Sequence, residues 1–136
     1  MNTKIPGLGI AHLALKAKDF DKSYKFYTEG LGMTPYLSWG EGDSHIQMLK
    51  FGDGAGILEL FAGGSDELPE MGKYIHFAYS VEDVDAAYET ALAAGAKPQT
   101  PPKSVALESE PRKVTIRIAF VIGPDGEQIE FFKEVG

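Results

Sequence analysis

Two histidine–glutamate pairs occupy matched places in the two halves of the chain. His12 and Glu59 lie in the first half, and His76 and Glu130 lie in the second. Two imidazole nitrogens and two carboxylate oxygens suit a borderline divalent ion such as Zn²⁺, Ni²⁺, Co²⁺, Fe²⁺ or Mn²⁺, and such a site leaves one or two positions open for water or substrate. An open position is typical of a catalytic metal, so these four residues are candidate ligands of a catalytic ion.

The spacing of the pairs indicates an internal duplication. The histidines are 64 positions apart and the glutamates 71. A few inserted residues explain the difference, because loops tolerate insertions better than helices or strands do. The shift of 64 also aligns four further pairs of identical residues, namely Ala14 with Ala78, Asp19 with Asp83, Asp21 with Asp85 and Tyr24 with Tyr88. We therefore expect two modules, each donating one His and one Glu.

Each glutamate stands among apolar residues. Glu59 lies within Ile-Leu-Glu-Leu-Phe, and Glu130 within Gln-Ile-Glu-Phe-Phe. A carboxylate that is buried without a partner is strongly destabilised or is forced to be neutral. Each glutamate therefore either faces solvent on the polar side of a strand or needs a cation, and strand alternation permits both arrangements.

Composition limits the classes of function. The chain has 136 residues, 43% of them apolar, which suits one ordinary domain. A net charge of −7 with two arginines leaves no basic stripe for nucleic acid, and the absence of cysteine removes disulfides, thiolate ligands and a cysteine nucleophile. No apolar run approaches the roughly 20 residues of a membrane span, and the first nine residues lack a signal-peptide core. We expect a cytoplasmic protein that binds neither membrane nor nucleic acid.

Hydrophobic periodicity and turn residues predict a β-α-β-β-β order in each half. In the first half we expect a strand at 10–16, a helix beginning at Asp19 and ended by Gly30 and Gly32, and strands at 33–39, 45–51 and 56–62. In the second we expect a strand at 75–81, a helix at 83–94 capped by Gly95, and strands at 105–109, 114–121 and 128–133, with a hairpin turn at Pro124-Asp125-Gly126.

The predicted fold class is α+β, with two tandem βαβββ modules at 8–64 and 73–134 that form one domain over residues 1–136 and contain mixed, curved sheets. In each module the His lies on the first strand and the Glu on the last. If those two strands border one concave sheet, their side chains can converge.

Several short motifs, in this order, resemble the vicinal oxygen chelate superfamily (glyoxalase/bleomycin resistance/dioxygenase), and glyoxalase I most closely. They are Gly-Ile-Ala-His-Leu-Ala-Leu around His12, Phe-Tyr-Thr-Glu-Gly-Leu-Gly-Met at 26–33, Ile-Leu-Glu-Leu at 57–60, His-Phe-Ala at 76–78, and Ile-Ala-Phe-Val at 118–121, which leads through 124–126 to Ile129 and Glu130.

The resemblance implies that His12, Glu59, His76 and Glu130 ligate the metal and that a homodimer builds each site from both subunits. It also implies a substrate, the hemithioacetal of a 2-oxoaldehyde with a thiol cosubstrate such as glutathione. The metal would acidify a C–H bond, and a carboxylate would carry the proton to the neighbouring carbon to give a 2-hydroxythioester. By analogy Glu130 is the base and Glu59 stays a ligand, although the near-symmetry of the halves leaves the reverse assignment open.

The departures from the family pattern keep other functions open. Glyoxalase I holds the carboxylates of glutathione with arginines and an asparagine, whereas this chain has only Arg112, Arg117 and Asn2. Lys50, Lys73 or those arginines could supply positive charge, but a lysine does not reproduce bidentate geometry, so a different thiol or small substrate is an alternative.

Phe120 replaces the tyrosine of extradiol dioxygenases, and Glu59 is present, so both residues argue against that activity. Epimerases acting on coenzyme A esters and fosfomycin-modifying enzymes remain alternatives. So does a metal-free protein that binds drugs such as bleomycin. The complete ligand set favours an enzyme.

Other residues are candidates for a substrate pocket, although aromatic residues in strands are more often core. The expected pocket residues are Trp39, Met48, Phe51, Tyr79 and Phe120. His45 has no counterpart in the second half, and we interpret it as structural or pocket-lining. The acidic run at 65–70 is expected to be a solvated linker, or to lie over the mouth of the site.

Overall fold

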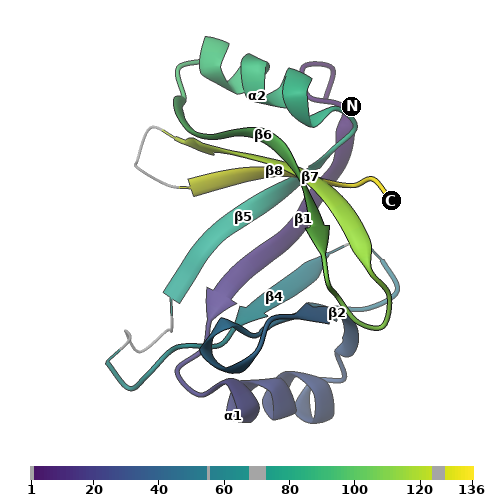
Figure 1. Ribbon diagram of the computed structural model, residues 1–136, viewed down its shortest axis with the longest axis vertical. Helices are drawn as coiled ribbons and strands as arrows, with labels where there is room; N and C mark the ends of the chain where they lie inside the picture. Colours follow the sequence, from purple (N-terminus) through teal and green to yellow (C-terminus); the bar gives the residue numbers. More distant parts are fainter. Residues whose placement is uncertain (1, 55, 68–72, 124–127) are drawn as a thin grey trace. The chain divides into compact units, whose positions relative to one another are not determined.

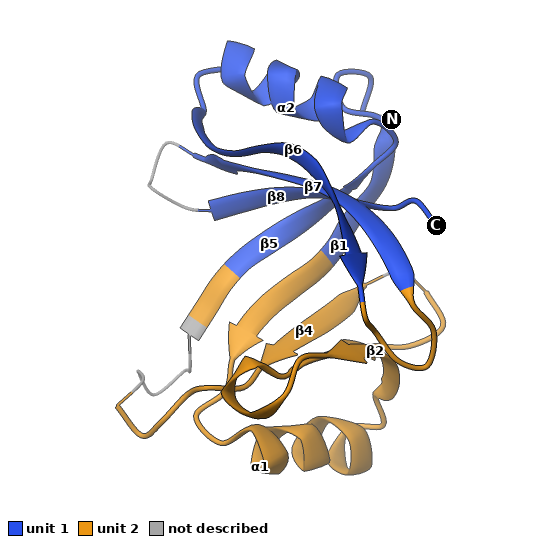
Figure 2. Cartoon of the chain, viewed as in Figure 1, with its two compact units in different colours: residues 1–11, 76–107, 114–136 blue, residues 12–75, 108–113 orange. Residues whose placement is uncertain are grey.

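The computed structural model describes residues 2–54, 56–67, 73–123 and 128–136, and it divides the chain into two compact units (Figure 2). Unit 1 comprises Met1–Ala11, His76–Leu107 and Val114–Gly136, and unit 2 comprises His12–Ile75 and Glu108–Lys113. The predicted turn at 124–126 and part of the acidic run, 68–70, lie outside the described residues. Among the described residues, no helix has the length and apolar character needed to cross a membrane.

Unit 2 contains the elements expected for the first half of the chain (Figure 1). They are β1 (Gly7–Lys16, shared with unit 1), α1 (Phe20–Lys25) continued by a π-helical turn (Phe26–Gly30), β2 (Thr34–Trp39), a 3₁₀ turn (Gly42–Ser44), β3 (Ile46–Lys50) and β4 (Ile57–Phe61). The strands are ordered β2-β3-β4-β1. β1 and β4 are parallel, and the other neighbours are antiparallel.

Unit 1 repeats this arrangement with the elements of the second half. They are β5 (Lys73–Val81, which begins in unit 2), α2 (Val84–Ala93), β6 (Lys97–Leu107), β7 (Val114–Ile122) and β8 (Gln128–Glu134). The strand order is β1-β5-β8-β7-β6. β5 is parallel to β8, and the β8–β7 and β7–β6 pairs are antiparallel. The expected βαβββ order and the mixed character of the sheet are confirmed in both halves.

Matched aspartates begin the two helices. The Asp19 carboxylate accepts a hydrogen bond from the backbone N–H of Lys22 at 3.2 Å, and Asp83 accepts one from Ala86 at 3.0 Å. Such N-caps satisfy backbone donors that have no partner within the helix. After α2, Gly95 adopts a φ of +110°, a conformation that glycine reaches without a steric penalty, which confirms its expected place at the helix end.

Each unit has its own hydrophobic core on the helix side of its sheet. In unit 2, the buried Leu58 and Leu60 of β4 belong to a cluster against which side chains of α1 pack. In unit 1, Val121 and Phe131 pack in one cluster with Tyr88 of α2. Side chains alternate between the two faces of a strand. The residues between these core positions, including Glu59 and Glu130, therefore lie on the face opposite the helices.

The prediction for β6 was wrong. A strand was expected at 105–109, whereas β6 runs over Lys97–Leu107 and includes Pro98, Pro101 and Pro102. Its only strand partner among the described residues is β7, and the pairing shifts register at two places near the prolines. Proline is tolerated on an edge strand because its missing N–H need not face a neighbour.

The cap of α2 provides a stability test. Replacing Asp83 with Ala removes the hydrogen bond to Ala86 and is expected to lower the free energy of unfolding by about 1 kcal/mol, whereas Asp83→Asn should be nearly neutral because asparagine caps equally well. Urea denaturation of the three proteins measures the difference. Equal destabilisation by both substitutions would show that the cap has no such role.

Candidate functional site

The first histidine–glutamate pair lies on neighbouring parallel strands of unit 2. Ala14 of β1 is aligned with Glu59 of β4, and His12 precedes Ala14 by two residues, so all three share one face of the sheet. The His12 Nε2 atom lies 3.4 Å from a carboxylate oxygen of Glu59. Both residues are buried, with His12 1% and Glu59 5% exposed.

The second pair repeats this geometry within unit 1. Ala78 of β5 is aligned with Glu130 of β8, and His76 again precedes the alanine by two residues. The His76 Nε2 atom lies 3.0 Å from a carboxylate oxygen of Glu130, which is 4% exposed. Because both alanines are completely buried, the same small side chain stands beside each carboxylate.

Burial answers the question that strand alternation left open for the glutamates. Neither carboxylate faces solvent, so each needs a partner to offset its lost hydration. In each unit an imidazole nitrogen occupies that place. Imidazole nitrogen and carboxylate oxygen are also the donors that borderline divalent ions accept, so both pairs fit a metal ion chemically.

Matched residues also flank the two glutamates on the next strand. Met48 of β3 is aligned with Glu59, and Phe120 of β7 is aligned with Glu130. The rings of Phe120 and His76 meet edge to face, with centroids 5.3 Å apart and planes at 84°. The structure thus brings two expected pocket residues, Met48 and Phe120, beside the glutamates of their own units.

The other expected pocket residues are placed differently. Trp39 ends β2 opposite Ile46, on the face that carries Met48. Phe51 follows β3 and is 57% exposed. Tyr79 points to the helix side of unit 1, where it packs against the core and its ring lies 6.2 Å from that of Phe131. Phe51 and Tyr79 are therefore not brought to the glutamates.

The candidate positive charges separate into two groups. Arg117 faces α2 and contacts both carboxylate oxygens of Asp85, the shorter contact being 2.8 Å. Lys50 and Arg112 instead lie over the ring of Tyr36, at 4.9 and 5.7 Å from its centroid, and an Arg112 N–H donates to the Tyr36 hydroxyl at 2.8 Å. The side chain of Lys73 is not described.

The contact between Tyr36 and Arg112 escaped sequence reasoning because it joins residues 76 positions apart. It depends on the segment Glu108–Lys113, whose Glu110 exchanges two backbone hydrogen bonds with Ser38 on β2. In that segment Glu108, 2.8 Å from Lys113, raises the pKa of the lysine through a hydrogen bond and its negative charge.

Comparison with known proteins identifies the family. The model of the glyoxalase/bleomycin resistance protein/dioxygenase superfamily matches residues 9–131. The uncharacterized protein YwbC of Bacillus subtilis is 34% identical over 127 residues, covering 91% of this chain and 96% of the relative. A lactoylglutathione lyase of Haemophilus influenzae is 34% identical over 131 residues, covering 91% of each chain.

A solved structure supports the fold assignment. Methylmalonyl-CoA epimerase from Mycobacterium tuberculosis aligns with a TM-score of 0.73, covering 100% of this chain and 94% of that chain, at 19% sequence identity. Because the sequence identity is only 19%, this structural similarity supports the fold alone. Together with the family match and the relatives above, it confirms the expected resemblance: the chain belongs to the glyoxalase/bleomycin resistance protein/dioxygenase superfamily.

Proposed function

We propose that this protein is a metal-dependent lyase of the glyoxalase I type, which converts the hemithioacetal of a 2-oxoaldehyde and a thiol into a 2-hydroxythioester. The observation that carries the proposal is the pair of buried carboxylates, each facing an imidazole at the same strand register. The similarity to a protein named lactoylglutathione lyase supports the reaction class.

The proposed metal ligands are His12, Glu59, His76 and Glu130. A single pair supplies only two protein ligands, whereas catalytic metal sites ordinarily have three or more, so both pairs are needed, whether from one chain or from two chains of a homodimer. When bound, a divalent ion would polarise the substrate oxygens and stabilise negative charge that develops on them.

Of the two glutamates, Glu130 is the proposed base and would give up its contact with the metal for that role, whereas Glu59 would remain a ligand. In this reaction the base takes a proton from the former aldehyde carbon and delivers it to the neighbouring carbon. It must therefore hold the proton without losing it to water. Glu130 is buried, and Phe120 lies beside it. Exclusion of water from such a site protects the proton from exchange and strengthens electrostatic interactions.

The proposed thiol-binding charges are those of Lys50 and Arg112. Lys50 follows Met48 by two residues on β3 and therefore shares the sheet face of Glu59. Arg112 reaches the same Tyr36 ring. A cation at this place would attract a carboxylate of the thiol, so glutathione and a thiol that lacks carboxylates should differ as cosubstrates.

Turnover tests the proposal directly. Metal-free protein mixed with methylglyoxal and glutathione should form thioester only after addition of Zn²⁺, Ni²⁺, Co²⁺ or Mn²⁺. Glu130→Gln should lower kcat by roughly 10²-fold or more, since a positioned base contributes about 10² to 10⁴. Glu89→Gln, which changes an exposed carboxylate on α2, is the matched control and should leave kcat unchanged.

Two results would count against the proposed function. Undiminished turnover of the Glu130→Gln variant would remove its proposed base. Binding of metal without turnover, for glutathione and for other low-molecular-weight thiols alike, would redirect the search to another reaction of the superfamily.

The contact between Phe120 and His76 leads to a separate prediction about metal affinity. Phe120→Met introduces the residue that the first half carries at the same register and removes the ring contact. Edge-to-face pairs contribute about 0.5–1.5 kcal/mol, so the Kd for Zn²⁺, measured by competition with a chromophoric chelator, should rise roughly two- to twelvefold. Met48→Leu is the control and should change the Kd less than twofold. Equal affinities of all three proteins would contradict an orienting role for Phe120.

A further inference from the structure

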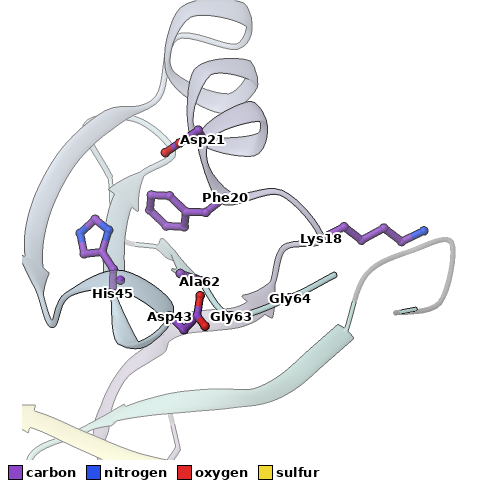
Figure 3. A pocket seen from close by; sticks show the side chains of 9 residues that line it. Lys18, Phe20, Asp21, Asp43, His45, Ala62, Gly63 and Gly64 are labelled. Carbon is purple, nitrogen blue, oxygen red and sulfur yellow. The ribbon is translucent and has the colours of Figure 1, made fainter. Parts of the chain in front are cut away.

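A hollow of about 370 Å³ lies within unit 2 (Figure 3), and neither His12 nor Glu59 lines it. It is formed where β1 ends, at the 3₁₀ turn before β3, and where the chain leaves β4. Its lining residues are Lys18, Phe20, Asp21, Gly42, Asp43, His45, Ala62, Gly63 and Gly64. Gly63 follows Glu59 by four residues, which corresponds to about 13 Å along an extended strand.

Acidic side chains dominate the charge of this hollow. Asp21 comes from the first turn of α1, and Asp43 comes from the 3₁₀ turn. Within the part of the chain that the structure describes, neither carboxylate makes a side-chain hydrogen bond or ion pair, and the imidazole of His45 makes none either. Figure 3 shows the amine of Lys18 extending away from Phe20, Asp43 and His45.

Two rings form an aromatic wall of the same hollow. The centroids of Phe20 and His45 are 4.8 Å apart, with their planes tilted by 52°. Both side chains are only partly buried, so part of this aromatic surface remains accessible. Aromatic faces attract organic cations, and carboxylates strengthen such binding by accepting charge-assisted hydrogen bonds from the cation.

Backbone contacts fix the position of Asp43 in the wall. Gly63 has a φ of +87°, and a Cβ atom at this position would lie 2.7 Å from the backbone oxygen of Asp43. The N–H of Ala62 donates to the carbonyl of His45 at 2.9 Å. The 3₁₀ turn is therefore held against the end of β4, and Gly63 permits this close approach.

We propose that this hollow binds an organic ammonium group, with Asp21 and Asp43 accepting its hydrogen bonds and the rings of Phe20 and His45 contacting its carbon chain. A bare metal ion fits less well, because the ligand atoms of Asp21, Asp43 and His45 do not form a close group of the kind that holds an ion. The inference uses residues of unit 2 alone and does not depend on the proposed lyase activity.

The test is an NMR titration of metal-free, ¹⁵N-labelled protein with n-butylamine, and with n-butanol as an uncharged probe of similar size. The amide signals of Gly42, Gly63 and Gly64 report on the hollow directly. Butylamine is expected to shift these signals saturably. Butanol should bind at least fivefold more weakly.

Substitutions locate the binding. Asp43→Asn and Asp21→Asn, which retain the size of the side chain, are each expected to raise the Kd for butylamine at least threefold. Glu41→Gln, an exposed acidic position outside the lining, should leave it unchanged. Equal affinity for butylamine and butanol, the absence of shifts at the three glycines, or an unchanged Kd in both aspartate variants would overturn the proposal.

Discussion

In each half of the chain a buried carboxylate faces an imidazole across two parallel strands, and this contact constrains how the strands and the helix can be arranged. Burying a carboxylate in each sheet is strongly unfavourable unless a cationic or hydrogen-bonding partner is fixed in place. The parallel register supplies that partner twice, by aligning Ala14 with Glu59 and Ala78 with Glu130. In each unit the apolar residues that flank the glutamate occupy the core against the helix. The glutamate therefore lies on the opposite face of the sheet.

The duplication preserves the histidine–glutamate pairs and varies their surroundings. Both halves keep the aspartate N-cap, the small alanine and the His–Glu pair, whereas the residue beside the glutamate is Met48 in one half and Phe120 in the other. The Met48 thioether is flexible, whereas the Phe120 ring makes a defined edge-to-face contact with His76, so the two side chains restrain their neighbours to different extents. Unequal surroundings of this kind would allow two chemically identical carboxylates to take the two roles proposed above, one as ligand and one as base.

Sequence patterns predicted the elements of the fold well, because the repeat, the caps and the turn glycines are local signals. Strand alternation could not decide whether Glu59 was buried, since the answer depends on which face α1 covers. It also could not separate Tyr79, which faces α2, from Phe120, which lies beside Glu130. The extent of β6 was missed because its three prolines are compatible with a strand only at a sheet edge. Tyr36 and Arg112 meet through a long-range contact that has no local signature.

A crystal structure of Zn²⁺-loaded protein, with anomalous diffraction data collected at the zinc edge, tests most directly whether the two histidine–glutamate pairs are metal ligands. We predict one strong anomalous peak for each set of four residues, with the imidazole nitrogens of His12 and His76 at about 2.0–2.1 Å from the zinc and oxygens of Glu59 and Glu130 as the other protein ligands. A structure without zinc at these residues, with both pairs retaining their direct His–Glu contacts, would contradict this prediction.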